Sequence, residues 1–271
     1  KTGSSEAKGL KLNPIGTEYL AHIVTGDITD KKFGAWLAYE YVEGIPLNDL
    51  LERRKFDGEP IAMRPRYEVM AQIAAGMRFL EQNGLCHRHL NCKNVIVLLE
   101  SLTHLRVKIT DYMLPYSFLN KVNAKSVNIN NFVAKSNAFL WWAPEAIISR
   151  TFDIKADVWS YGCLIFEILT DGEVPYSFEA SPITKITELI HFFENPANKM
   201  KLAPEVSKAP EPFIHQIVYK CLNRDPNLRP KFATLDKFFC DLLFNTKLNP
   251  TQVIREATEL LGSAAPKPTS H

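Results

Sequence analysis

The sequence predicts an α+β fold that is predominantly helical and contains a small amount of β-structure. Two runs rich in β-branched and aromatic residues, 19–24 and 35–42, come first. Segments with apolar residues at helical spacing follow, and a second pair of short β-type runs lies between them at 95–99 and 105–109. A chain of 271 residues is long enough to bury a full core.

The first part of the chain reads as a linker followed by two strands. Residues 1–16 are rich in Lys, Gly and Ser, which is typical of a flexible linker. The segments Tyr19 to Val24 and Ala35 to Val42 are predicted strands, joined by a polar turn over Gly26 to Lys32. A short helix is predicted over Asn48 to Arg54. Val95 to Leu99 and Leu105 to Ile109 are further predicted strands, which fit a hairpin.

Helical periodicity is clearest from Met63 to Asn83, where the following Gly84 is a candidate C-cap. The apolar stripe of this helix is Val69, Ile73, Met77 and Leu80. Other predicted helices are Asp157 to Leu169, Glu211 to Leu222 and Leu235 to Phe244, the first of them buried on most sides. A last amphipathic helix is predicted from Thr251 to Leu261, and the tail after it is expected to be disordered.

Composition restricts the class of partner and the compartment. The formal net charge is only +2, which argues against nucleic acid as a general partner. No apolar run reaches the roughly 18–20 residues that span a bilayer, so no membrane span is expected. The cysteines are odd in number and have no zinc-type spacing, so we expect free thiols in a reducing, cytoplasmic compartment. They are Cys86, Cys92, Cys163, Cys221 and Cys240.

Several motifs follow one another in a recognisable order. The chain contains Cys86-His87-Arg88-His89-Leu90-Asn91-Cys92-Lys93-Asn94, then Asp111-Tyr112-Met113, Ala143-Pro144-Glu145, Asp157-Val158-Trp159-Ser160-Tyr161-Gly162 and Pro226-Asn227-Leu228-Arg229-Pro230. Together they resemble the eukaryotic protein kinase family. The resemblance covers mostly the larger, C-terminal lobe. Trp141 and Trp142 before Ala143 favour a resemblance to the tyrosine-kinase-like branch of the family.

The resemblance implies a division of the chain. Residues 1–16 would be a flexible linker, and 17–44 the last strands of a partial β N-lobe with the hinge. Residues 45–247 would form a kinase-like C-lobe with a short β hairpin, and 248–271 an amphipathic helix and a disordered tail. That helix would fold back on its own lobe or dock on a partner. Neither a glycine-rich phosphate loop nor a Val-Ala-x-Lys strand occurs before Tyr19, so the part of the N-lobe that holds them either lies outside this chain or does not exist.

The same resemblance implies where a nucleotide would bind. The main chain of Glu40 and Val42 would bond the adenine, Tyr39 would be a bulky gatekeeper, and Ile96 would contact the base. The segment around Glu40 is equally typical of a plain strand that ends in a turn. Lys93 would be a weak phosphate ligand, and Asn94 and Asp111 would hold Mg²⁺ if a nucleotide were bound.

The residue that performs catalysis in this family is replaced. His89 stands where the family has its catalytic Asp, and Met113 removes the glycine of the metal-binding turn. A histidine has an unperturbed pKa near ~6.5 and could act as a base, but beside Arg88 it would resist becoming a cation. Loss of a positioned base costs roughly 10²–10⁴-fold in rate. No catalytic residue is therefore expected to be intact.

The residues to which the family assigns structural roles are retained. They are His87, Arg88, Glu145, Asp157 and Arg229. Glu145 is expected to pair with Arg229, and Asp157 is expected to accept backbone N–H bonds from the loop that contains His89. The sequence therefore favours a pseudokinase that requires no cofactor and works on other proteins as a scaffold or allosteric regulator. The alternatives are an active atypical Ser/Thr or Tyr protein kinase, and a domain that binds ATP and Mg²⁺ without transfer.

Overall fold

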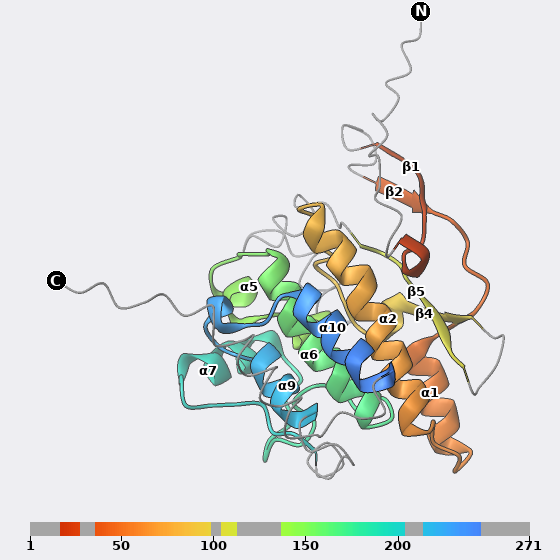
Figure 1. Ribbon diagram of the computed structural model, residues 1–271. Helices are drawn as coiled ribbons and strands as arrows, with labels where there is room; N and C mark the ends of the chain where they lie inside the picture. Colours follow the sequence, from red (N-terminus) through yellow and green to blue (C-terminus); the bar gives the residue numbers. More distant parts are fainter. Residues whose placement is uncertain (1–16, 28–35, 99–103, 113–136, 204–213, 245–271) are drawn as a thin grey trace, which may run out of the picture.

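The computed structural model describes residues 17–27, 36–98, 104–112, 137–203 and 214–244 (Figure 1). These residues form a mostly helical structure with one two-stranded and one three-stranded sheet, which confirms the predicted α+β class. Several predictions lie outside the described residues: the linker at 1–16, most of the turn at 26–32, the amphipathic helix at 251–261 and the tail after it.

The first sheet pairs β1 (Ile23–Asp27) with β2 (Trp36–Tyr39) in antiparallel orientation. The predicted strand over 19–24 is wrong at its start, because η1 (Thr17–Tyr19) is a turn of 3-10 helix. Leu20 and Ala21, which follow it, are buried, and the Ala21 N–H donates to the Ile109 carbonyl at 2.8 Å. The apolar run thus reflects insertion into the core. The second predicted strand is also shorter than expected, since it ends at Tyr39.

The second sheet has the order β3-β4-β5, formed by β3 (Ile45–Pro46), β4 (Val95–Leu98) and β5 (Arg106–Ile109). Neighbouring strands in this sheet are antiparallel. Val95 of β4 pairs with Ile109 of β5, which confirms the two predicted strands of the hairpin. Val95 and Val97 face the core whereas Ile96 is half-buried. The sequence did not predict β3, because two residues that include a proline carry no strand pattern.

Two helices follow the strands in the predicted places. They are α1 (Leu47–Phe56) and α2 (Met63–Gln82). The predicted stripe on α2 is fully buried. Gly84 adopts a φ of +66°, and Leu85 N–H reaches back to the Leu80 carbonyl at 2.9 Å, which confirms a glycine-terminated helix end.

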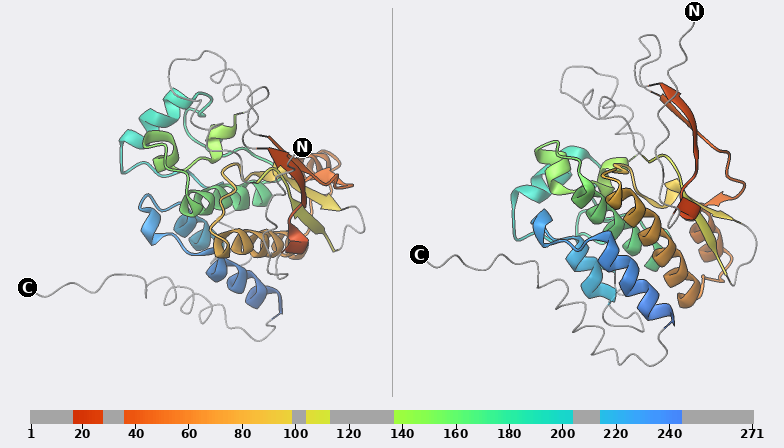
Figure 2. Two further views of the ribbon diagram at one scale, coloured as in Figure 1. Left: turned by 90° about the horizontal axis from the view of Figure 1, so that it is seen from above. Right: turned by 45° about the horizontal axis from the view of Figure 1, so that its top comes forward.

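The helix α6 (Ile154–Leu169) forms the centre of the helical part. The carboxylate of Asp153 caps it by accepting from the N–H groups of Lys155 and Ala156 at 2.9 and 3.1 Å. All residues from Ala156 to Leu169 are buried. The helix α9 (Ile214–Cys221) packs against α6, and both views of Figure 2 show α10 (Phe232–Phe244) beside α2.

Two further helices were not predicted from the sequence. They are α5 (Pro144–Ile148) and α7 (Ile186–Glu194), and their short length leaves little room for a periodic pattern. Four-residue η3 (Ala138–Trp141) precedes α5, with Phe139, Leu140 and Trp141 buried. This apolar stretch therefore packs into the domain.

The five cysteines are free, as predicted, with Cys86 and Cys240 only partly buried. Within the part of the chain that the structure describes, no helix has the length and apolar character needed to cross a bilayer.

The tight crossing of α6 and α9 yields a prediction about Gly162. A Cβ at this position would lie 2.8 Å from the Cys221 Cβ and 3.1 Å from Leu222. We expect Gly162→Ala to lower the free energy of unfolding by about 1–3 kcal/mol in urea titration, because the overpacking outweighs the better helix propensity of alanine.

Gly76→Ala in α2 is the matched control. Its new Cβ would meet the terminal methyl of Ile109 at 2.8 Å, and this methyl can move by rotation. We expect the smaller loss there. Equal losses at the two positions would contradict the overpacking explanation.

Candidate functional site

A buried carboxylate on α6 holds the loop between α2 and β4. Asp157 accepts from the backbone N–H groups of His87 and Arg88, each at 2.7 Å. Arg88 has a φ of +69°, a conformation that costs free energy for a non-glycine residue and that these two bonds support. Burial raises the pKa of Asp157 to about 7, against the lowering effect of the two N–H donors. The contacts expected for Asp157 are therefore present.

His89 projects from this fixed loop and is hydrogen-bonded to Asn94. The Asn94 Nδ2 amide donates to the His89 carbonyl at 2.7 Å and lies 3.1 Å from the His89 Nδ1. Because an amide nitrogen has only N–H groups to offer, Nδ1 must be the acceptor. Burial lowers the pKa of His89, the Asp111 carboxylate raises it, and Lys93 lowers it again. With the lone pair of Nδ1 facing the Asn94 amide, the ring carries its proton on Nε2.

This tautomer decides what His89 can do chemically. One ring nitrogen already accepts a hydrogen bond and the other already carries a proton, so no free lone pair remains to take a proton from a hydroxyl. The sequence could not establish this point, because it depends on the position of Asn94 relative to the ring.

His87 is fully buried behind this loop, where its Nδ1 accepts from the His89 N–H at 3.3 Å. Burial first, and then the neighbouring His89, lower the pKa of His87 to about 3. A histidine that stays neutral and has no exposed surface supports the structural role that was expected for it.

Asn94 and Asp111 are the two expected Mg²⁺ ligands. Because Nδ2 of Asn94 is engaged by His89, its Oδ1 is the atom left for a cation. Asp111 is exposed and has a φ of +56°. Magnesium is often held by one or two protein oxygens together with phosphates and water. This donor set therefore fits Mg²⁺ that arrives with a nucleotide. Among the described residues, no cluster of three or more His, Cys, Asp or Glu could hold a metal alone.

The segment expected to bind adenine is fixed to both sheets. The Glu40 N–H donates to the His22 carbonyl at 2.7 Å, and its carboxylate accepts from the His22 N–H and from Lys108. The bond with Lys108 is the main cause that lowers the pKa of Glu40. Within the described ranges, the Glu40 carbonyl and the Val42 N–H take part in no hydrogen bond, so the two groups expected to meet adenine remain open. Ile96 is half-buried on β4, and the Lys93 side chain is exposed.

Two tyrosines connect the turn after β5 to the first sheet, an arrangement that the sequence did not reveal. The Tyr39 hydroxyl donates to the Tyr112 carbonyl, and the Tyr112 hydroxyl donates to the Ala21 carbonyl at 2.6 Å. Their rings meet edge to face with centroids 5.2 Å apart. Burial raises the pKa of both hydroxyls, that of Tyr112 to about 12, so both stay protonated donors. Met113, the next residue, lies outside the described residues.

The expected ion pair between Glu145 and Arg229 is present. Arg229 donates to both carboxylate oxygens, with Nη2 2.9 Å from Oε2, and its side chain is fully buried. Its remaining donors bind the Lys155 and Asn223 carbonyls at 2.8 and 2.7 Å. Each nitrogen of the guanidinium thus makes at least one hydrogen bond, and α5 is fixed to the loop after α9.

A second buried carboxylate was missed from the sequence. Glu167 on α6 accepts from the indole N–H of Trp141 at 3.0 Å and from the Cys92 N–H at 3.3 Å. It therefore joins the loop that contains His89 to η3. Burial raises the pKa of Glu167 to about 7, against the lowering effect of these donors. A lone Glu in the apolar run Cys163 to Leu169 was the only available signal.

Comparison with known proteins places these features in a family. A family model described as "Protein tyrosine and serine/threonine kinase" matches residues 19–239. The chain is 32% identical over 201 residues to "Tyrosine protein-kinase src-1" of Caenorhabditis elegans, which covers 74% of this chain and 35% of that protein.

Two human proteins are similarly related. "Tyrosine-protein kinase FRK" is 34% identical over 178 residues, which is 66% of this chain and 32% of the relative. "Vascular endothelial growth factor receptor 1" is 34% identical over 211 residues, which is 75% of this chain and 14% of the relative. The chain spans about a third or less of the length of these curated relatives.

The position of Glu167 predicts a pH-dependent stability. A carboxyl whose pKa rises from 4.5 to about 7 on folding stabilises fully below pH 4.5, and this contribution is lost as the pH rises through 7. Glu167→Gln keeps an acceptor for Trp141 and cannot ionise. The unmodified chain should lose stability between pH 5.5 and pH 8.5 as Glu167 ionises, and the variant should not. We therefore expect the unfolding free energy of the variant, minus that of the unmodified chain, to rise by roughly 1–2 kcal/mol over this pH range.

Urea titrations at the two pH values measure this difference, and the titration of other buried groups cancels in the comparison. Glu173→Gln, in a partly exposed ion pair with Lys55, is the control and should give parallel profiles. Parallel profiles for Glu167→Gln as well would contradict the assignment.

Proposed function

The chain belongs to the protein tyrosine and serine/threonine kinase family, and from this premise we propose that it is a catalytically inactive member, a pseudokinase. Its action is on other proteins, as a protein-interaction scaffold or allosteric regulator, in the cytoplasm. The five free thiols support this proposed location, because free thiols persist in a reducing compartment.

The state of His89 is the observation that carries the proposal. Phosphoryl transfer to a protein hydroxyl uses a carboxylate at this place to orient the hydroxyl and accept its proton. Here a neutral imidazole accepts from Asn94 through Nδ1 and holds its proton on Nε2. It therefore supplies neither the negative charge nor the proton acceptor of the missing Asp.

The contacts that hold the domain together support a role in binding. The Glu145–Arg229 pair, the Asp157 contacts with the loop and the Glu167 contacts with Trp141 and Cys92 are all made. None of them requires a nucleotide. The domain can therefore present a stable surface to another protein while its reaction centre is inactive.

Nucleotide binding without transfer is compatible with this proposal. Asn94 Oδ1 and Asp111 would hold Mg²⁺, and the open Glu40 carbonyl and Val42 N–H would bond the adenine. When bound, the ion would neutralise and orient the phosphates. The two tyrosines fill the back of this region, with Tyr39 half-buried and Tyr112 buried. These retained groups are also what favours the alternative, an active atypical kinase whose N-lobe lies outside this chain.

Radiolabelled phosphate transfer tests the proposal. The full chain, incubated with ATP, Mg²⁺ and a tyrosine- and serine-containing peptide mixture, should incorporate no more phosphate than its Asp111→Ala variant. The physical reason is the loss of a positioned base, worth roughly 10²–10⁴-fold. An active tyrosine kinase assayed in parallel shows that the peptides are substrates.

The outcome that contradicts the proposal is incorporation by the unmodified chain that disappears in Asp111→Ala. A rise in Tm on addition of ATP and Mg²⁺ that Asp111→Ala removes, without incorporation, would identify binding without transfer.

A further inference from the structure

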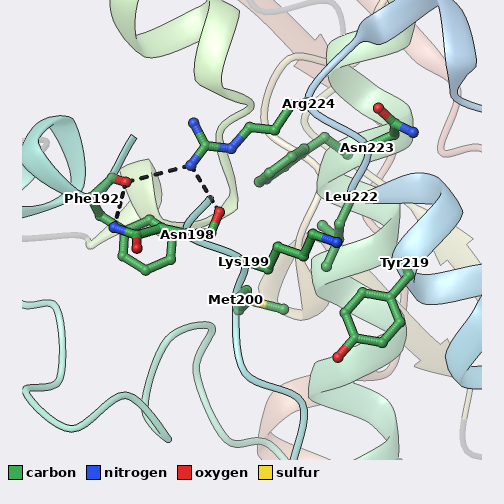
Figure 3. Close-up of a pocket in the computed structure, with 9 residues that line it drawn as sticks. Phe192, Asn198, Lys199, Met200, Tyr219, Leu222, Asn223 and Arg224 are labelled. Carbon is green, nitrogen blue, oxygen red and sulfur yellow. Dashed lines mark hydrogen bonds between the residues drawn. The ribbon is translucent and has the colours of Figure 1, made fainter. Parts of the chain in front are cut away.

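A pocket of about 450 Å³ lies in the helical part of the chain, away from His89, Asn94 and Asp111. Its walls come from α6, α7, the segment after α7, and α9 with the loop that follows it (Figure 3). This volume lies within the range of roughly 300–1,000 Å³ that small-molecule sites occupy. Trp159 is its only lining residue among the described ones that belongs to a motif quoted above.

One wall is held by Arg224. Its guanidinium donates to the carbonyls of Phe193, Asn195 and Asn198 at 2.8, 3.1 and 3.0 Å, and more weakly to that of Phe192 at 3.4 Å. It also lies 4.8 Å above the Phe193 ring. Through these bonds Arg224 holds together the carbonyls at the end of α7 and in the turn after it. The backbone of this wall is therefore fixed without a ligand.

The opposite wall is held by Arg229. Its Nε donates to the carbonyl of Asn223 at 2.7 Å, and its guanidinium lies 5.2 Å from the ring of Trp159. Both of these partners line the pocket. Since Arg229 is itself fixed by Glu145, the pocket is bounded on two sides by preorganised side chains. Binding of a ligand would therefore cost little conformational entropy in these side chains.

The lining combines aromatic surface with positive charge. Trp159, Phe192 and Tyr219 contribute rings, and the cations are Arg224 and Lys199. None of the described residues that line the pocket is acidic. Lys199 is exposed and forms no ion pair with any described residue, and in Figure 3 it extends toward Leu222 and Tyr219 while Arg224 points to Phe192 and Asn198. An anion placed here would therefore meet a cation that has not been neutralised.

We propose that this pocket binds a small aromatic carboxylate, whose fused rings lie among Trp159, Phe192 and Tyr219 and whose carboxylate pairs with Lys199. The rings supply burial and edge-to-face contacts, and Lys199 selects for negative charge. The site is independent of the proposed function, because it shares no residue with the region around His89.

Ligand-observed NMR titration with naphthoate and its neutral isostere naphthamide tests the proposal on the full chain. We expect saturable naphthoate binding with a Kd of about a millimolar or tighter, and at least roughly threefold weaker binding of naphthamide. Lys199→Met retains the apolar stem and removes the charge, so it should weaken naphthoate roughly three- to tenfold and leave naphthamide unchanged.

Three further variants separate the pocket from general surface charge. Lys201→Met removes a neighbouring exposed lysine outside the pocket and should leave both Kd values unchanged. Tyr219 is 44% exposed, so charged side chains are tolerated there, and both substitutions remove one ring of the pocket. Tyr219→Glu and Tyr219→Lys should therefore weaken naphthamide equally, whereas Tyr219→Glu should weaken naphthoate more than Tyr219→Lys does.

Three results would overturn the proposal. They are the absence of saturable naphthoate binding up to ten millimolar, equal affinities for naphthoate and naphthamide, and equal effects of Lys199→Met and Lys201→Met. The phosphate-transfer assay gives an independent result, so failure here leaves the assignment as a pseudokinase unaffected.

Discussion

The buried helix α6 fixes the rest of the site through two carboxylates that have no cationic side chain among the described residues as hydrogen-bond partner. Asp157 binds the backbone of His87 and Arg88, and Glu167 binds Cys92 and Trp141. The loop that presents His89 is thus held at both ends by one rigid element. A buried carboxylate without such donors would be costly, so the fold of the loop and the burial of the helix depend on each other.

The two tyrosines extend this constraint to the first sheet. The Asp111 side chain is exposed, but the Tyr112 that follows it is buried and bonded at both its hydroxyl and its carbonyl. A turn that is fixed at its second residue has little freedom to change state. The site therefore combines potential metal ligands with a rigid frame.

Sequence reasoning located what depends on local pattern. The long helices α2 and α6 have clear apolar periodicity, and the motif residues could be assigned by resemblance. Sequence reasoning failed where the decisive contact is distant in sequence. Leu20 and Ala21 have the residue pattern of a strand, but they are buried because they pack beside Ile109 of β5. The bonds from Tyr39 to Tyr112, from the Cys92 N–H to Glu167, and from Arg224 to the end of α7 could not be predicted for the same reason. The tautomer of His89 likewise follows only from the position of Asn94.

The retained and the replaced residues differ in what their loss costs. Removing one partner of a buried pair such as Glu145–Arg229 leaves an unpaired charge and costs ~3–5 kcal/mol, a large part of the 5–15 kcal/mol that stabilises a typical domain. An Asp replaced by a neutral His at position 89 leaves no unpaired charge, because Asn94 supplies the donor that the ring needs. Catalytic chemistry at this position can therefore be absent without destabilising the frame, whereas Glu145, Asp157 and Arg229 cannot be changed independently of folding.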